Sequence, residues 1–237
     1  MMSQPVFLFD LDGIIVDTAV YHYQAWKRLA QELGFDIDEE FNEQLKGISR
    51  VDSLHRILEH GQVVLTEADF DRWATQKNTW YLELIEEMTP QHLLPGVADF
   101  FANCRTNGIR CGLGSASKNA PKILEKVGLL EAFDALVDGN SVSKSKPDPE
   151  VFLKGAELLG VEPARCIVFE DALAGIEAAE AAGMKSVGIG DPTVLTQATM
   201  SICFASSRYL RSIAMVPPPH LFHLQHRRSQ IPLLARF

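Results

Sequence analysis

The sequence predicts an α/β protein whose parallel β-sheet is interrupted in the chain by an inserted helical module. Beyond Gly96, short apolar segments alternate with helical segments, which is typical of a parallel sheet covered by helices on both faces. One further strand is expected much earlier, at 6–9, and about 75 residues of helical pattern separate it from the rest. The sheet domain is therefore expected to be discontinuous in sequence.

Each element follows from a local pattern. The apolar run 6–9 stops at the turn 10–13, where Gly13 permits a tight bend. Between 18 and 88 apolar residues recur at helical spacing, with a stop at Gly34 and a capping-box pattern at 66–69 that opens a long helix. In the alternating region we expect strands at 109–113, 135–137, 166–169 and 186–189, with helices ending near 107 and covering 120–127, 149–159 and 172–182; residues 200–204 could add an edge strand.

Composition excludes several classes of protein. With 237 residues, 46% of them hydrophobic, the chain can bury a large core in one or two domains. No apolar run approaches the ~20 residues of a membrane span, and no leader precedes Asp10, so we expect a cytoplasmic protein without a membrane partner. The net charge of −9 argues against nucleic acid and favours a small ligand. Four cysteines are expected to be reduced core thiols: Cys104, Cys111, Cys166 and Cys203.

Polar segments follow four of the predicted strands, at the sheet edge where ligands collect in α/β proteins. They are the aspartates Asp10 and Asp12, the loop 114–117, Lys146 beside two prolines, and the pair Glu170-Asp171. Each segment alone could be a helix cap or a solvated side chain. Together they supply carboxylates for a divalent cation, and N–H groups, hydroxyls and an ammonium for an anion.

This ordered set resembles the four motifs of the haloacid dehalogenase superfamily of phosphotransferases, over roughly residues 5–191. Further segments resemble its β-phosphoglucomutase family: Tyr21-His22, Ala25-Trp26, 41–47, Ser49-Arg50, Lys77-Asn78, 115–119 and 145–147. The resemblance implies a Rossmann-like core at 1–15 and 94–215 and an α-helical cap at 16–93, followed by an atypical tail at 216–237.

The resemblance also implies roles for individual residues. Asp10 would be the nucleophile that carries the phosphoryl group, and Asp12 the general acid and base. Mg²⁺ would be held by Asp10, the backbone carbonyl of Asp12 and Asp171, with Glu170 nearby. The residues expected to bind substrate or phosphate are His22, Trp26, Lys46, Gly47, Arg50, Ser53, Lys77, Ser115, Ala116, Ser117, Asn119 and Lys146. The implied reaction interconverts β-D-glucose 1-phosphate and D-glucose 6-phosphate through β-glucose 1,6-bisphosphate. The resemblance also implies a monomer.

Two alternatives stay open. A phosphatase acting on sugar phosphates or phosphoglycolate would share the Asp10 chemistry and pass the phosphoryl group to water; a non-catalytic phosphate-binding module would use its aspartates only for metal. Arg50 is the candidate anchor for the second phosphate that a mutase must hold, since guanidinium binds phosphate in a bidentate manner. However, Lys46 and Arg50 could also lie on a solvated face, His22 on a helix surface, and Lys77 could extend its ammonium group to water.

The end of the chain differs from the rest. The 46 residues after Asp191 contain five arginines and no acid, so they carry +5 against −14 for the preceding residues. The run 217–219 is three prolines, which cannot continue a helix, and His220, His223 and His226 follow it. Three histidines could bind a metal, but we expect a solvated or disordered arm that does not match the family.

Overall fold

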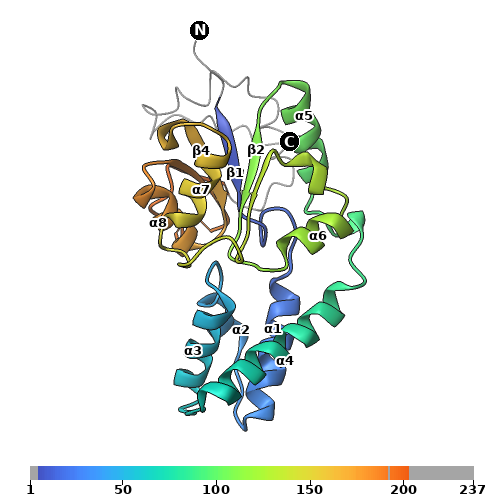
Figure 1. The fold of residues 1–237 in the computed structure, drawn as a ribbon, viewed down its shortest axis with the longest axis vertical. Helices are drawn as coiled ribbons and strands as arrows, with labels where there is room; N and C mark the ends of the chain where they lie inside the picture. Colours follow the sequence, from blue (N-terminus) through green and yellow to red (C-terminus); the bar gives the residue numbers. More distant parts are fainter. Residues whose placement is uncertain (1–4, 192, 203–237) are drawn as a thin grey trace, which may run out of the picture.

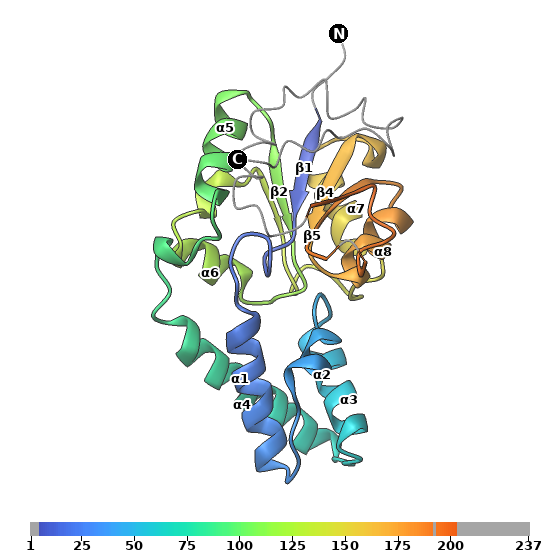
Figure 2. The same ribbon diagram turned by 180° about the vertical axis from the view of Figure 1, so that it is seen from behind.

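The computed structural model describes residues 5–191 and 193–202 (Figures 1 and 2). Its centre is a parallel sheet of six strands in the order β3-β2-β1-β4-β5-β6. The strands are β1 (Val6–Phe9), β2 (Cys111–Gly114), β3 (Ala135–Val137), β4 (Cys166–Glu170), β5 (Lys185–Ile189) and β6 (Met200–Ile202). The helices are α1 (Ala19–Glu32), α2 (Glu39–Glu43), α3 (Arg50–His60), α4 (Glu67–Ile85), α5 (Val97–Thr106), α6 (Ala120–Lys126), α7 (Glu150–Leu158) and α8 (Leu173–Ala181).

The residues of β1 alternate between two helical layers. Phe7 and Phe9 pack with aromatic residues of α5, and Phe9 stacks on Phe169 of β4 with ring centroids 4.8 Å apart. Val6 and Leu8 point to the opposite face and pack with α7 and α8. The ribbon shows α5 and α6 on one side of the sheet and α7 and α8 on the other (Figures 1 and 2). This confirms the predicted parallel sheet covered on both faces.

Helices α1 to α4 lie between β1 and β2 in sequence and form a separate group at one end of the sheet (Figure 1). We call α1–α4 the cap, and the sheet with α5–α8 the core. Helix α4 packs against α1 and α3, and it begins after Thr66, whose hydroxyl accepts a hydrogen bond from the Asp69 N–H at 3.2 Å. The helical insertion is confirmed. The exact domain limits stay a prediction.

Some boundaries differ from the sequence prediction. Helix α4 ends at Ile85 rather than near Met88. Pro90 follows, and Thr89 directly before it has extended backbone, as the residue before a proline prefers. Strand β2 begins at Cys111, two residues later than predicted, where it pairs in register with Phe7. The prediction also missed that α2 and α3 are separate helices. Strand β6 confirms the edge strand up to Ile202.

Further predictions concern the thiols, the membrane and the tail. Cys104, Cys111 and Cys166 are buried and free, as expected. In the part of the chain that the structure describes, no helix has both the length and the apolar character needed to cross a bilayer. Cys203, the three histidines of the tail and the range 216–237 lie outside the described residues.

Candidate active site

A buried lysine joins two strands at the carboxyl edge of the sheet. Lys146 Nζ lies 2.6 Å from Asp10 Oδ1 and 2.6 Å from Glu170 Oε1, and Lys146 is only 2% exposed. The other oxygen of Glu170 accepts the Ala172 N–H at 2.9 Å. Although burial opposes a positive charge, the carboxylates of Asp10 and Glu170 raise the pKa of Lys146. The alternative of a solvated Lys146 is therefore wrong.

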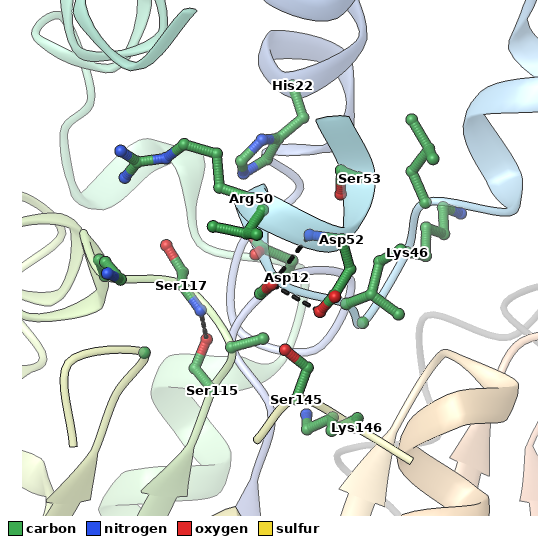
Figure 3. Close-up of a pocket in the computed structure, with 18 of the residues that line it drawn as sticks. Asp12, His22, Lys46, Arg50, Asp52, Ser53, Ser115, Ser117, Ser145 and Lys146 are labelled. Carbon is green, nitrogen blue, oxygen red and sulfur yellow. Dashed lines mark hydrogen bonds between the residues drawn. The ribbon is translucent and has the colours of Figure 1, made fainter. Parts of the chain in front are cut away.

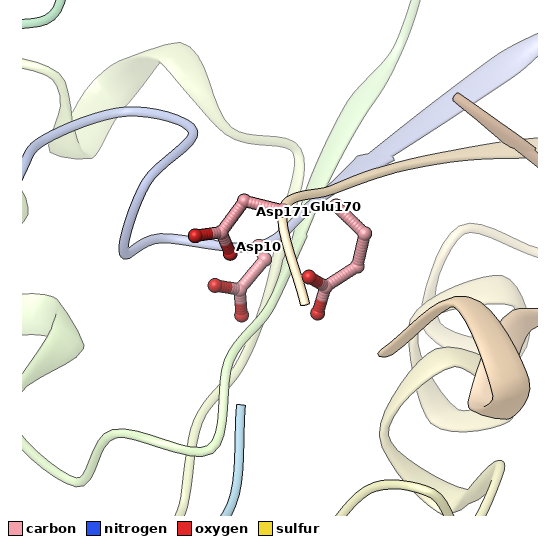
Figure 4. A group of neighbouring side chains, drawn as sticks. All are labelled: Asp10, Glu170 and Asp171. Carbon is pink, nitrogen blue, oxygen red and sulfur yellow. The ribbon is translucent and has the colours of Figure 1, made fainter. Parts of the chain in front are cut away.

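Three carboxylates converge beside this lysine (Figure 4). Asp10, Glu170 and Asp171 each offer an oxygen, and these atoms lie within 4.8 Å of one another. Burial and the charges of Glu170 and Asp10 raise the pKa of Asp171 well above its ordinary value. One lysine does not balance three carboxylates, and a small divalent cation that prefers oxygen ligands fits this donor set. The carboxylate of Asp12 lies outside this cluster.

Two glycines leave room for the acidic side chains. Gly13 has a φ of +73°, and a Cβ there would lie 2.1 Å from Asp171 Oδ2. A Cβ at Gly175 would lie 1.8 Å from Glu170 Oε1. Sequence reasoning recognised Gly13 as a turn residue but missed Gly175, because a close approach between a helix and a preceding strand leaves no local pattern.

Asp12 is turned toward the start of the cap. The hydroxyl of Thr18 donates a hydrogen bond to Asp12 Oδ1, and the Asp12 N–H donates to Asp10 Oδ2 at 3.1 Å. Burial and the charge of Asp10 raise the pKa of Asp12 to about 7, against the opposing effect of Thr18. A carboxyl group with a pKa near neutrality is suited to both giving and accepting a proton. The sequence did not predict a role for Thr18 in the site.

The loop between β2 and α6 is held by a chain of hydroxyl contacts. The Ser117 N–H donates to Ser115 Oγ at 3.1 Å, and the Asn119 N–H donates to Ser117 Oγ at 3.2 Å. The Ser115 N–H itself donates to the carbonyl of Val137 in β3 at 2.9 Å. The loop is therefore ordered by its own side chains before any ligand binds, at the beginning of helix α6.

The cap buries a second lysine. Lys77 is 1% exposed, and its Nζ lies 2.7 Å from His22 Nδ1 and 4.2 Å from the centroid of the Trp26 ring. Burial and the charge of Arg50 lower the pKa of Lys77 well below its ordinary value, and burial and Lys77 lower that of His22. Among the described residues Lys77 makes no ion pair. The alternative of an ammonium group extended to water is therefore wrong for Lys77.

Cap and core together line a cavity of about 1210 Å³. Figure 3 shows His22, Arg50 and Ser53 of the cap facing Ser115, Ser145 and Lys146 of the core. Of the predicted site residues the cavity is lined by Asp10, Asp12, His22, Trp26, Lys46, Gly47, Arg50, Ser53, Lys77, Ser115, Ala116, Ser117, Asn119, Lys146 and Asp171. Glu170 is fully buried and does not line the cavity.

The cap loop that carries Lys46 and Gly47 comes close to the core. A Cβ at Gly47 would lie 3.1 Å from the Cβ of Ala172, which follows the acidic pair. Lys46 Nζ forms an ion pair with Glu43 at 2.8 Å. Sequence reasoning gave no role to Asn78 or Lys118, which also line the cavity, although both lie within the segments it quoted. Their spacing along a helix or a loop does not distinguish a cavity-facing side chain from a solvated one.

Comparisons with known proteins agree with this geometry. Residues 5–183 match the family model of the haloacid dehalogenase-like hydrolases. The chain is 45% identical to the β-phosphoglucomutase of Bacillus subtilis over 77% of its length and 82% of that protein. It is 34% identical to a fructose-1-phosphate phosphatase of Escherichia coli, over 77% of this chain and 94% of that protein.

A solved structure has the same fold as this chain. The β-phosphoglucomutase of Clostridium difficile superposes with a TM-score of 0.83 at 43% identity, covering 90% of this chain and 98% of that one. Both the order of the motifs and the arrangement of sheet and cap are thus accounted for. The chain belongs to the haloacid dehalogenase-like hydrolase family and, within it, to the β-phosphoglucomutase family.

Proposed function

We propose that this protein interconverts β-D-glucose 1-phosphate and D-glucose 6-phosphate through β-glucose 1,6-bisphosphate. One observation carries the proposal. The same cavity is lined on its core wall by Asp10, Asp12 and Lys146 and on its cap wall by Arg50 and Lys77, two basic side chains that make no ion pair with any residue that the structure describes. A mutase must hold two phosphates at once, whereas a phosphatase needs a site for one. The cap wall supplies the charge for the second.

The core wall would carry out the transfer. The Asp10 carboxylate attacks one phosphorus of the bisphosphate, the bond from that phosphorus to the sugar oxygen breaks, and Asp12 gives that oxygen its proton, which leaves a sugar monophosphate. In the other half-reaction Asp12 takes the proton of the free hydroxyl of a sugar monophosphate. The oxygen of that hydroxyl attacks the phosphoryl group on Asp10, the bond from phosphorus to Asp10 breaks, and the bisphosphate forms. Ser115, the Ala116 N–H and Lys146 would hold the oxygens of the group in transit, where fixed donors and positive charge oppose the developing negative charge.

The acidic cluster would hold Mg²⁺. The proposed ligands are the carboxylates of Asp10 and Asp171 and the backbone carbonyl of Asp12, with Glu170 nearby. The ion would neutralise charge on the phosphoryl oxygens and on the carboxylates that must approach them. Gly13 makes this possible on the protein side, because any side chain there would collide with Asp171.

The cap wall would bind the other phosphate. Arg50 is the proposed anchor, with Ser117 and Asn119 assisting from the core, and Trp26, Lys46, Gly47 and Ser53 lining the sugar site. His22 and Lys77 would couple cap closure to proton transfer by Asp12, since the Asp12 charge acts on Lys77. A cytoplasmic monomer is the form in which we expect the enzyme to work.

A sugar-phosphate phosphatase is the second candidate. The similarity to a fructose-1-phosphate phosphatase favours it, because an Asp10 acyl phosphate can also pass to water. The two enzymes differ in which acceptor reaches the phosphorylated aspartate.

One experiment separates them. A panel of sugar monophosphates, with β-glucose 1,6-bisphosphate as primer, is assayed for isomerisation and for phosphate release side by side, with Mg²⁺ and with a chelator. We expect isomerisation of β-glucose 1-phosphate to exceed phosphate release from every monophosphate, and both to stop in the chelator. Phosphate release that is faster than isomerisation would establish the phosphatase instead.

A further inference from the structure

A hydrogen bond inside the cavity joins the cap to the loop that precedes α6. Nδ2 of Asn119 donates to Oδ1 of Asn78 at 2.9 Å. Asn78 lies in α4, Asn119 directly precedes α6, and both residues line the cavity. Glu86 also reaches the core, through Lys122 and Lys126, but these three residues do not line the cavity. Asn78 is thus placed to act on the loop at the point where a substrate would bind.

The hydrogen bond to Asn78 fixes the orientation of the Asn119 side-chain amide. The backbone of this residue is held by the hydroxyl chain through Ser117, but its side chain can rotate. A carboxamide has an acceptor oxygen and a nitrogen with two N–H groups. When Oδ1 of Asn78 accepts one N–H of Asn119, which lines the cavity, the second N–H stays available for a ligand. A phosphate oxygen can only accept, so this orientation favours phosphate and the flipped amide does not.

Asn78 also links the loop to the buried charges of the cap. The preceding residue is Lys77, whose ammonium group contacts His22 of α1. One turn of α4 therefore touches both the first helix of the cap and the phosphate-binding side of the core. A movement of the cap relative to the core would therefore shift Lys77 and Asn78 together.

We propose that Asn78 is a positioning residue for the second phosphate. It holds the Asn119 amide with its free N–H directed at the phosphate that is not at Asp10. The inference rests on the proposed function and deepens it, because it makes the affinity for the bisphosphate depend on where the cap lies. The phosphate that reacts at Asp10 does not require Asn78.

The first measurement is the Kd of β-glucose 1,6-bisphosphate, by calorimetry with Mg²⁺ in an Asp10→Asn background that cannot turn it over. Asn78→Leu is expected to weaken binding roughly two- to tenfold, the effect of one neutral hydrogen bond. Asn78→Ser is expected to weaken it likewise and covers the case in which leucine disturbs α4. Thr79→Val is the matched control, because the Thr79 hydroxyl donates only to Thr75 in its own helix among the described residues.

A second measurement separates positioning from a general loss of structure. With Asp10 intact, acetyl phosphate carries a single phosphoryl group and should phosphorylate Asn78→Leu at the wild-type rate. Asn119→Ala should weaken bisphosphate binding, and adding Asn78→Leu to it should change little, because the two residues act as a unit. Additive losses, or slower phosphorylation by acetyl phosphate, would overturn the proposal.

The failure of this inference is distinguishable from that of the proposed function. If Asn119→Ala weakens bisphosphate binding and Asn78→Leu does not, the role of Asn78 is wrong while the second phosphate site stands. If neither substitution changes the Kd, Asn119 does not contact the second phosphate, and both the inference and that part of the proposed function are wrong.

Discussion

The core and the cap each bury a lysine, and the surroundings of the two lysines are opposite. Lys146 lies between the carboxylates of Asp10 and Glu170, which raise its pKa. Lys77 lies against aromatic rings and His22, where burial and Arg50 lower its pKa. The core site therefore keeps excess negative charge that a divalent cation would neutralise, whereas the cap carries positive charge that an anion would stabilise. This difference is what we expect if the core holds the reacting groups and a phosphate of the substrate neutralises the positive charge of the cap.

The largest expected effect removes the core chemistry altogether. Asp10→Asn replaces the carboxylate by an amide that cannot form an acyl phosphate, so isomerisation should fall below detection. The fold should persist, as checked by circular dichroism and thermal melting. Asp36→Asn, which changes an exposed aspartate of the cap, is the matched control. Substantial turnover by Asp10→Asn would contradict the mechanism.

The next substitution removes the buried cation of the core. Lys146→Met leaves the buried carboxylates of Asp10 and Glu170 without their counter-charge, which should lower the free energy of unfolding by about 3 to 5 kcal/mol. Urea denaturation in a chelator measures the loss. Adding Mg²⁺ should recover part of it, since a divalent cation can replace the missing charge. An unchanged stability would show that the lysine does not compensate the acids.

A smaller effect tests the cap as a phosphate anchor. Arg50→Ala should slow isomerisation roughly 10- to 150-fold, the equivalent of ~1.5 to 3 kcal/mol for a charged hydrogen-bonded pair. Hydrolysis of phosphorylated Asp10 by water should keep its rate, because Arg50 lies on the opposite wall. The two rates are measured on one preparation of enzyme. Equal isomerisation by variant and wild type would favour the phosphatase.

Lys77→Met should change the free energy of unfolding in the opposite direction to Lys146→Met. Removing a buried charge that has no acidic partner among the described residues should raise the free energy of unfolding by about 1 to 2 kcal/mol while isomerisation falls. The pKa of Lys77 is lower in the folded than in the unfolded state, so the folded state binds this proton more weakly. The stability of the wild type therefore rises with pH. The extra stability of the variant should shrink as the pH approaches ~10.4, the ordinary pKa of lysine. Denaturation at several pH values measures this trend. A destabilised variant would mean that Lys77 is a structural cation like Lys146.

The smallest expected effect comes from shortening the end of the chain, which leaves the residues that line the cavity unchanged. Ending the chain before Val216 removes residues 216–237, the part of the acid-free stretch that we expect not to match the family, so isomerisation should stay within about twofold of the full chain. Turnover of the truncated and complete proteins under one set of conditions provides the test. A large loss would show that the tail contributes to function and that the comparison of core and cap is incomplete.

Much of the core site follows from local sequence. A parallel sheet brings the ends of its strands to one edge, so the turn after 6–9 and the acidic pair at 170–171 could be placed together from strand positions alone. The apolar spacing between 18 and 88 likewise predicted a helical insert. These features depend on residues close in sequence, and the physical preferences that produce them act locally.

Only the tertiary structure decided which side chains meet. Lys146 contacts Asp10 across 136 positions, and Lys77 contacts His22 across 55. Whether a lysine on a helix or loop is solvated or buried depends on what packs over it, and a one-dimensional pattern does not contain that information. The close approach of Glu170 to Gly175, and of Asn119 to Asn78, has the same origin. The sequence by itself determined the elements and the chemistry available at the sheet edge. Tertiary packing, within the core around Lys146 and within the cap around Lys77, decided the direction in which the pKa of each lysine moves, because burial and neighbouring charges set the free energy of ionisation.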